Sequence, residues 1–135
     1  MTLVEVVVAL AIVGVTVGGI IAGYINCTTA TVKAELEQAA NAKAMERLEA
    51  TRSAIWAPER ADPVDQLVVS NFPDVTVSLD MPGTNVTGTV ATIQTTIASI
   101  SASPPMRLVH VDCLWQFQGG PRITNSVETI RAGDQ

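Results

Sequence analysis

One long uncharged segment restricts the fold of this chain more than any other feature. After Glu5 the next charged residue is Lys33, so residues 6–32 carry no charge. About 20 apolar residues are enough to cross a bilayer as a helix, and residues 1–25 read MTLVEVVVALAIVGVTVGGIIAGYI. A helix satisfies its own backbone hydrogen bonds in lipid, so we expect a helix here despite the strand preference of valine. The segment predicts a membrane anchor.

The rest of the chain has the composition of a soluble domain. Hydrophobic residues make up 47% of the 135 residues and charged residues 16%, but every charge except Glu5 follows residue 32. The formal net charge is −5, and the basic residues are scattered among more numerous acids. A nucleic-acid binder needs a basic surface that replaces phosphate counterions. This charge balance therefore argues against a nucleic-acid partner.

Residues 28–57 contain neither glycine nor proline, and their pattern is amphipathic. Apolar residues recur every three or four positions, charges occupy much of the other face, and Pro58 supplies the stop. We therefore expect one helix from Thr2 to about Trp56, near 80 Å long, which is too long for this small domain to bury. The charges on its second half form either a solvated face or contacts between copies: Glu35, Glu37, Glu46 and Arg47.

After Pro58 the hydrophobic pattern changes to the alternation that is typical of strands. We expect a proline-rich loop at 57–65, a strand or helical turn at 67–70, a turn at 81–84, and strands at 75–80, at 108–117 and at 122–131. Residues 86–101 are expected to form either one long strand or two short strands that break near Gly88. The clearest strand places Val109, Val111, Cys113, Trp115 and Phe117 on one face. We expect Trp115 and Phe117 to pack on the helix near Leu48 and Ile55.

The predicted fold class is α+β. A long N-terminal α-helix, with its apolar half protruding, is packed by a small antiparallel sheet of three to four strands. The chain divides into an apolar half-helix at 1–25, the amphipathic half of the same helix at 26–57, and a β-sheet domain at 58–135.

Glu5 is the exception within the apolar segment. A carboxylate inside hydrocarbon costs several kcal/mol and usually marks a function or a partner. The α-amine of a processed Met1, from the same or a neighbouring chain, is its natural counter-charge. The alternative is a glutamate that reaches the headgroups near the helix end.

This opening resembles the mature N-terminus of type IV pilins and type II secretion pseudopilins. The matching residues are Thr2, Leu3, Val4 and Glu5, followed by Val6 to Ile12, Gly14 and Tyr24. The resemblance covers residues 1–25, and a glutamate at the fifth position of such a run is its most specific part. The first residue of the family is usually phenylalanine, whereas some type IVb pilins and minor pseudopilins have methionine, as here. The resemblance implies the pilin fold, in which a small antiparallel sheet packs on a long N-terminal helix.

The resemblance also implies how the chain is processed and assembled. A prepilin peptidase removes a short basic leader, Met1 is N-methylated, and the present chain is then the mature form. Glu5 pairs with the Met1 amine of an adjacent subunit and registers incoming subunits. The implied partners are other copies of the chain and the pilus or secretion assembly machinery. The subunit lies in the inner membrane first, and then in a cell-surface filament, or in the periplasm for a pseudopilin.

We therefore expect a structural subunit that polymerises into an extracellular helical filament with the apolar helices as its core. The main alternative is a minor pilin or minor pseudopilin that initiates or caps a filament. A third is a monomeric single-pass membrane protein with a small binding domain. The sequence has no nucleotide-binding loop, HExxH motif, CxxC pair or catalytic triad, so we expect no enzyme activity and no cofactor.

Four glycines interrupt the apolar segment at spacings that permit close helix packing. Gly14 and Gly18, and likewise Gly19 and Gly23, form small-xxx-small pairs. Each glycine also weakens the helix by roughly 1 kcal/mol relative to alanine. Many pilins have a proline at position 22, where this chain has Ala22. We expect any unwinding within a filament to centre on residues 15–23.

The remaining candidate sites are weaker. The export that the resemblance implies permits a Cys27–Cys113 disulfide, but the places of the two cysteines favour two buried thiols. His110 and Asp112 share a strand face, as in a surface ion pair.

No calcium site is expected, although some major pseudopilins bind calcium, because Asp62, Asp65, Asp80 and Asp134 are not at ligand spacing. Sequons occur at Asn85 and, closer to the lipid boundary, at Asn26, and the Thr/Ser-rich residues 84–103 suit O-glycans or an uncharged strand equally well.

Overall fold

The computed structural model describes residues 2–80 and 88–134. The chain divides into two compact units, Met1–Glu35 and Leu36–Gln135. The helix α1 (Leu3–Arg52) belongs to the first unit up to residue 35 and to the second unit thereafter. The domain boundaries drawn from composition, after residues 25 and 57, remain predictions.

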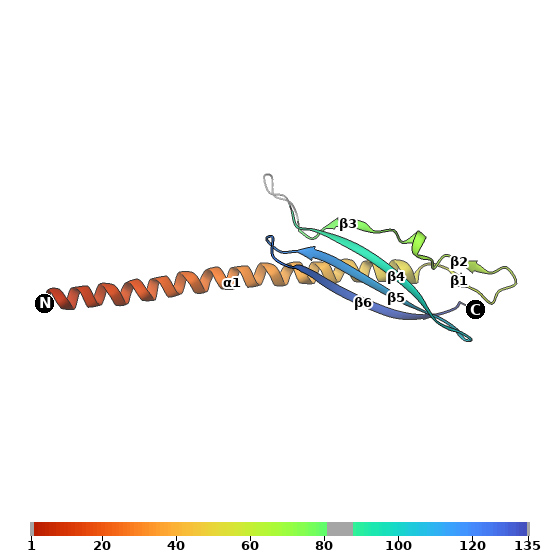
Figure 1. The fold of residues 1–135 in the computed structure, drawn as a ribbon, viewed down its shortest axis with the longest axis horizontal. Helices are drawn as coiled ribbons and strands as arrows, with labels where there is room; N and C mark the ends of the chain where they lie inside the picture. The colour runs from red at the N-terminus through yellow and green to blue at the C-terminus, as the bar shows by residue number, and fades with distance from the viewer. Residues whose placement is uncertain (1, 81–87, 135) are drawn as a thin grey trace. The chain divides into compact units, whose positions relative to one another are not determined.

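The second unit contains every strand of the described chain. Its elements after α1 are β1 (Trp56–Ala57), β2 (Val64–Asp65), the 3-10 helix η1 (Val69–Asn71), β3 (Val75–Ser78), β4 (Val90–Ala102), β5 (Pro105–Gln116) and β6 (Arg122–Ala132). The last four strands form one antiparallel sheet in the order β3-β4-β5-β6, seen side by side in Figure 1. β1 and β2 form a separate antiparallel pair. The α+β fold class is confirmed.

The core lies between the second half of α1 and the inner face of the sheet. The helix contributes residues four apart, which fall on one face: Leu36, Ala40, Ala44 and Leu48. β5 contributes the alternating residues Val109, Val111, Cys113 and Trp115, all buried. Two alanines at the centre of the helical stripe allow the helix to approach the sheet closely. The predicted buried face of 108–117 is therefore confirmed for these four residues, and Phe117 is half-buried against the same core.

The C-terminal end of the helix differs from the prediction. α1 ends at Arg52, four residues before Trp56. At this end, Nη1 of Arg131 in β6 donates to the carbonyl oxygens of Thr51 (2.9 Å) and Ala54 (2.7 Å). These bonds satisfy carbonyls at the helix end, and the chain turns into β1. Ile55, expected beside Trp115 in the core, is instead 46% exposed.

The segments between the helix and the main sheet agree only in part with the structure predicted from the sequence. Residues 67–70 were expected as a strand or helical turn, and η1 is a short 3-10 helix at Val69–Asn71. The β1–β2 pair was not predicted, because strands of two residues carry no alternation to detect. The predicted turn at 81–84 lies within residues 81–87, which are outside the described residues.

Arg107 of β5 holds the β1–β2 pair and the following loop against the sheet. Its guanidinium donates to both Asp65 carboxylate oxygens at 2.7 and 2.6 Å and to the Leu67 carbonyl at 2.6 Å. It also lies over the Trp56 ring, 4.6 Å from the ring centroid. Bidentate arginine–carboxylate pairs are directional as well as charged. One cation therefore organises a loop that has little regular structure of its own.

This arginine makes the fold sensitive to acid. The hydrogen bonds from Arg107 hold the pKa of Asp65 below its ordinary value of 3.8, and burial opposes them only in part. Because the folded pKa is the lower one, the stabilisation is complete above the ordinary value and is lost as pH falls through the folded pKa.

We therefore expect D65N to lower the melting temperature of the detergent-solubilised chain at pH 7 by a few degrees. Asp65 is 40% exposed, and solvent screening limits the effect to about 1 kcal/mol. The difference from the wild type shrinks below about pH 4. Thermal unfolding followed by circular dichroism across pH measures it. D62N is the control, because the exposed Asp62 makes no interaction within the described residues. An equal D65N effect at pH 7 and pH 2 contradicts the assignment.

Candidate functional site

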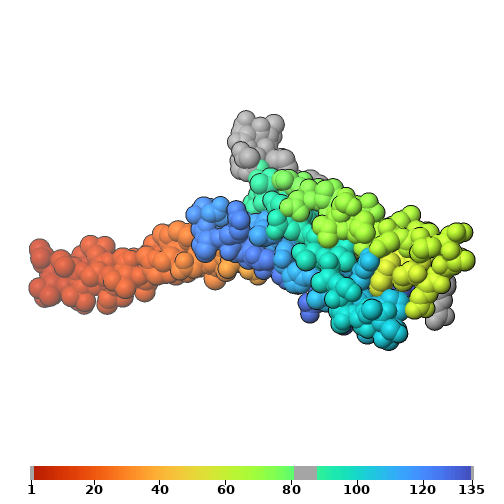
Figure 2. Space-filling view, turned by 45° about the vertical axis from the view of Figure 1, so that its right-hand side comes forward, coloured from red at the N-terminus to blue at the C-terminus, as the bar shows by residue number. Residues whose placement is uncertain are grey.

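The first unit presents an apolar surface that its own described residues do not cover. Every described residue from 2 to 35 is exposed, and large side chains such as Leu3 (81%), Ile20 (71%) and Tyr24 (73%) are mostly open. The side chains of this red-to-orange stretch lie at the surface in Figure 2. By length and composition, α1 is able to cross a membrane, and none of its most apolar window is buried. This surface is the leading candidate for a functional site.

The apolar residues of this unit surround the helix instead of forming one stripe. Exposed valine, leucine and isoleucine side chains follow one another from Leu3 to Ile25. A helix that is hydrophobic on all sides is stable only in lipid or among other apolar elements. The second half of α1 has the opposite arrangement, with one buried stripe and charges elsewhere. The first half of the helix therefore requires apolar surroundings on all sides, whereas the second half requires them on one side only.

The polar side chains of the apolar half are compatible with lipid. The hydroxyl of Thr16 donates to the Ile12 and Val13 carbonyl oxygens at 2.9 Å. The hydroxyls of Thr28, Thr29 and Thr31 each donate at 2.9 Å to the carbonyl four residues earlier. Threonine side chains commonly bond back to the preceding turn in this way. These bonds were not expected from the sequence. They satisfy the threonine hydroxyl donors within the helix itself.

Glu5 lies in the first turn of α1. Its backbone N–H donates to the Thr2 carbonyl at 3.0 Å, which starts the helix at that point. A carboxylate near a helix N-terminus is favoured by the helix dipole. Met1, the proposed counter-charge and methylation site, lies outside the described residues. The pairing of Glu5 with a terminal amine therefore stays a prediction.

The four glycines of the apolar half have no packing role within the chain. A Cβ atom built at Gly14, Gly18, Gly19 or Gly23 meets nothing within 4 Å outside the helix backbone near it. α1 continues through all four as regular helix. Their cost in helix stability is thus not offset by any contact in the folded chain.

The two cysteines are free thiols in different units. Cys27 is exposed on α1, and Cys113 is buried in the core of the second unit. Burial raises the pKa of the Cys113 thiol above its ordinary value, so this group behaves as a small apolar core residue. The expectation of two buried thiols therefore holds for Cys113 and not for Cys27.

The outer face of the sheet carries the expected pair of His110 and Asp112. His110 Nε2 lies 3.0 Å from Asp112 Oδ1, and its Nδ1 lies 3.4 Å from the Glu128 carboxylate. Ser126 donates to the same Asp112 oxygen. The sequence reading missed Glu128 and Ser126, because both come from β6 and only the β5–β6 register places them beside β5. The cluster ties two strands together.

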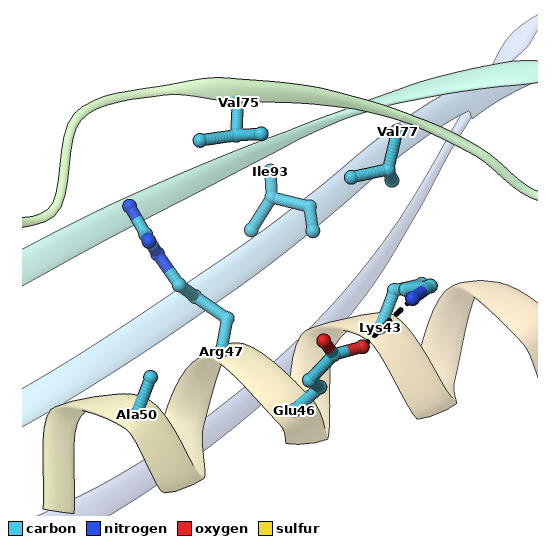
Figure 3. Close-up of a pocket in the computed structure, with 7 residues that line it drawn as sticks. All are labelled: Lys43, Glu46, Arg47, Ala50, Val75, Val77 and Ile93. Carbon is cyan, nitrogen blue, oxygen red and sulfur yellow. Dashed lines mark hydrogen bonds and ion pairs between the residues drawn. The ribbon is translucent and has the colours of Figure 1, made fainter. Parts of the chain in front are cut away.

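A hollow lies between α1 and the strands β3 and β4 (Figure 3). It is lined by Lys43, Glu46, Arg47, Ala50, Val75, Val77 and Ile93. Its volume, about 170 Å³, is below the range of pockets that bind drug-sized ligands. Lys43 and Glu46 pair on its helical side at 2.8 Å. Arg47 donates to Thr95 and to the Pro73 carbonyl. These charged groups are therefore used in holding the fold.

Three of the four aspartates considered for calcium lie in separate structural contacts, and Asp62 is exposed. Asp65 binds Arg107, Asp80 accepts from the Thr89 N–H, and Asp134 accepts from Arg131 and from the Trp56 N–H. Within residues 2–80 and 88–134, no three histidine, cysteine or acidic side chains are placed to hold a metal ion. Asn85 and its sequon lie outside the described residues, while Asn26 is exposed on α1.

No family model matches the chain, and neither a curated protein nor a solved structure matches it. What the structure establishes is the architecture. A long N-terminal helix begins with an apolar half that is able to span a membrane, and its second half packs on an antiparallel sheet. This arrangement is pilin-like.

Proposed function

We propose that this chain is the structural subunit of a helical filament of the type IV pilin kind. The observation that carries the proposal is that every described residue from 2 to 35, apolar residues included, is exposed in the single chain. Such a surface requires lipid before assembly and other copies of the same helix afterwards. In a filament core each helix supplies the apolar surroundings of its neighbours.

The apolar surface, the glycine pairs and Glu5 favour a filament subunit over a simple membrane anchor. Hydrophobic burial is worth about 25 cal/mol per Å² of apolar surface, so an apolar half-helix that leaves the membrane must be covered again. The small-xxx-small glycine pairs support close helix approach, which an anchor surrounded by lipid does not need. Glu5 supports a specific partner, because an unpaired carboxylate in lipid is costly. Contacts between different faces of successive copies do not close, and they generate a filament.

We propose an order of processing and assembly that meets these requirements. A prepilin peptidase processes the chain, Met1 is N-methylated, and the subunit waits in the inner membrane. Assembly machinery then moves it into a filament outside the membrane, with Glu5 registering it against the terminal amine of a neighbour. A minor subunit that starts or caps the filament has the same requirements, and only its abundance differs.

Mass spectrometry of filaments sheared from the host cells tests the proposal and separates major from minor subunit. We expect this chain to be the most abundant protein of the filament fraction and to begin with an N-methylated Met1. A trace amount in filaments built from another pilin assigns the minor role. If the chain is confined to the membrane fraction and filaments lack it, the filament function is wrong.

A further inference from the structure

The second unit has an open sheet edge along β6. β6 forms its ladder with β5 alone, and the sheet order places it outermost (Figure 1). Within the described residues, no backbone hydrogen bond joins β6 to any other element. In an antiparallel pair roughly half of the N–H and C=O groups of each strand point away from the partner. β6 therefore presents a row of unpaired backbone groups.

This edge lacks most of the features that normally prevent strand pairing. Edge strands are usually very short, bulged, or interrupted by lysine or proline. β6 has eleven residues with neither lysine nor proline, and its register with β5 is continuous. The other edge strand, β3, has only four residues. The inward-pointing Arg131 lies near the far end of β6, where its guanidinium is bound to Asp134 and to the end of α1.

The two faces of β6 differ in exposure. Its even-numbered residues from Arg122 to Ala132 are exposed, and its odd-numbered residues are half-buried. Ile123 and Val127 lie at the border of the core. Arg122 makes no side-chain hydrogen bond or ion pair within the described residues, and Glu128 reaches only His110 at 3.4 Å. The edge thus offers an arginine and a carboxylate six residues apart and two apolar side chains between them.

These residues match a second copy of the same strand. In a two-fold antiparallel pair centred on Asn125, Arg122 lies opposite Glu128 of the other copy, and this contact occurs twice. Ile123 lies opposite Val127, also twice. Directly opposed residues with opposite charge or with apolar side chains stabilise a sheet, and like charges destabilise it.

Other registers lack this match. A shift by one residue places the core face of one strand beside the outer face of the other. Centring the pair on Thr124 places Glu128 opposite Gly120, and centring it on Ser126 places Arg122 opposite Ile130 and Glu128 opposite Thr124. The edge is therefore self-complementary in one register.

We propose that β6 is an interface at which two copies of this chain join their sheets, over residues 122–128, around a two-fold axis at Asn125. A two-fold contact closes on a pair, so it is distinct from the contacts that build a filament and adds a link between copies. The proposal depends on the second unit alone and stands or falls independently of the filament function.

Register-specific cross-linking tests the interface in the full chain. Two tagged variants, T124C and S126C, are made in a C27S background, because Cys27 is exposed and Cys113 is buried. They are mixed in detergent micelles and mildly oxidised. Opposed residues in an antiparallel pair have Cα atoms about 4.5–5.5 Å apart, a distance that a disulfide spans. We expect the mixed T124C–S126C dimer to form well in excess of either homodimer. No cross-link, or equal yields of all three dimers, overturns the register.

Exchanging the charges of Arg122 and Glu128 gives a second test of the interface. R122E places two carboxylates opposite each other at both ends of the pair, and we expect the mixed dimer to need about tenfold more protein or more. The double variant R122E/E128R restores opposite charges and is expected to restore the dimer. Circular dichroism confirms that each variant is folded. Unchanged cross-linking in R122E, or no recovery in the folded double variant, contradicts the proposed pairing.

Discussion

We expect filament yield to fall at least about tenfold when Glu5 is replaced by glutamine, and the chain still to reach the membrane. Breaking a buried ion pair by removing one partner costs about 3–5 kcal/mol, and each 1.4 kcal/mol is a factor of ten in an equilibrium. The neutral amide is easier to place in lipid than a carboxylate, so membrane insertion is retained. What E5Q removes is the counter-charge for the amine of a neighbouring subunit. Quantifying the chain in sheared and membrane fractions measures the effect.

A matched variant separates this role from a general change of charge. E59Q makes the same substitution at an exposed position of the second unit, and we expect it to leave filament yield unchanged. E5A is expected to behave as E5Q does, because both lack the charge. Wild-type yield in E5Q would show that Glu5 only reaches toward the headgroups, as the alternative interpretation holds.

We also expect filament yield to fall, by about tenfold or more, when Gly14 and Gly18 are both replaced by leucine. The single chain has room for these side chains, since nothing lies within 4 Å of a Cβ at either position. Leucine is also a better helix former than glycine, so the isolated helix is not weakened. Between helices in close contact, extra bulk costs about 1–3 kcal/mol. The loss in yield therefore reports contacts between copies. Filament yield and helix content by circular dichroism are the two measurements.

The control for added bulk lies on the same helix. V13L/V17L adds volume at neighbouring exposed positions outside the small-residue pairs, and we expect a yield close to that of the wild type. If G14L/G18L assembles as well as V13L/V17L does, close approach at these glycines is not part of the filament.

The sequence predicted the fold well where a periodic pattern decides the structure. The stripe that contains Leu36 and Leu48 and the alternation from Val109 to Trp115 each identify a buried face, and both faces form the core. The end of α1 and the β1–β2 pair escaped prediction, because Arg131 and Arg107 reach them from residues far along the chain. No local pattern carries such contacts.

The candidate site was predictable in part for a related reason. An apolar segment with a single glutamate is evident from the order of residues alone, and the structure adds that every described residue from 2 to 35 is exposed. Which helices cover this surface depends on other molecules. The open edge of β6 is likewise a property of strand order, which alternation within one strand does not determine.

Cryo-EM of sheared filaments at side-chain resolution tests the central claim most directly. The proposed assembly predicts that residues 6–32 of every subunit lie in the filament core away from water, with the Glu5 carboxylate within hydrogen-bond distance of the Met1 amine of a neighbouring subunit. It further predicts that any departure from regular helix centres on residues 15–23. A filament of this chain in which residues 6–32 face solvent, or in which Glu5 has no amine beside it, would contradict the account.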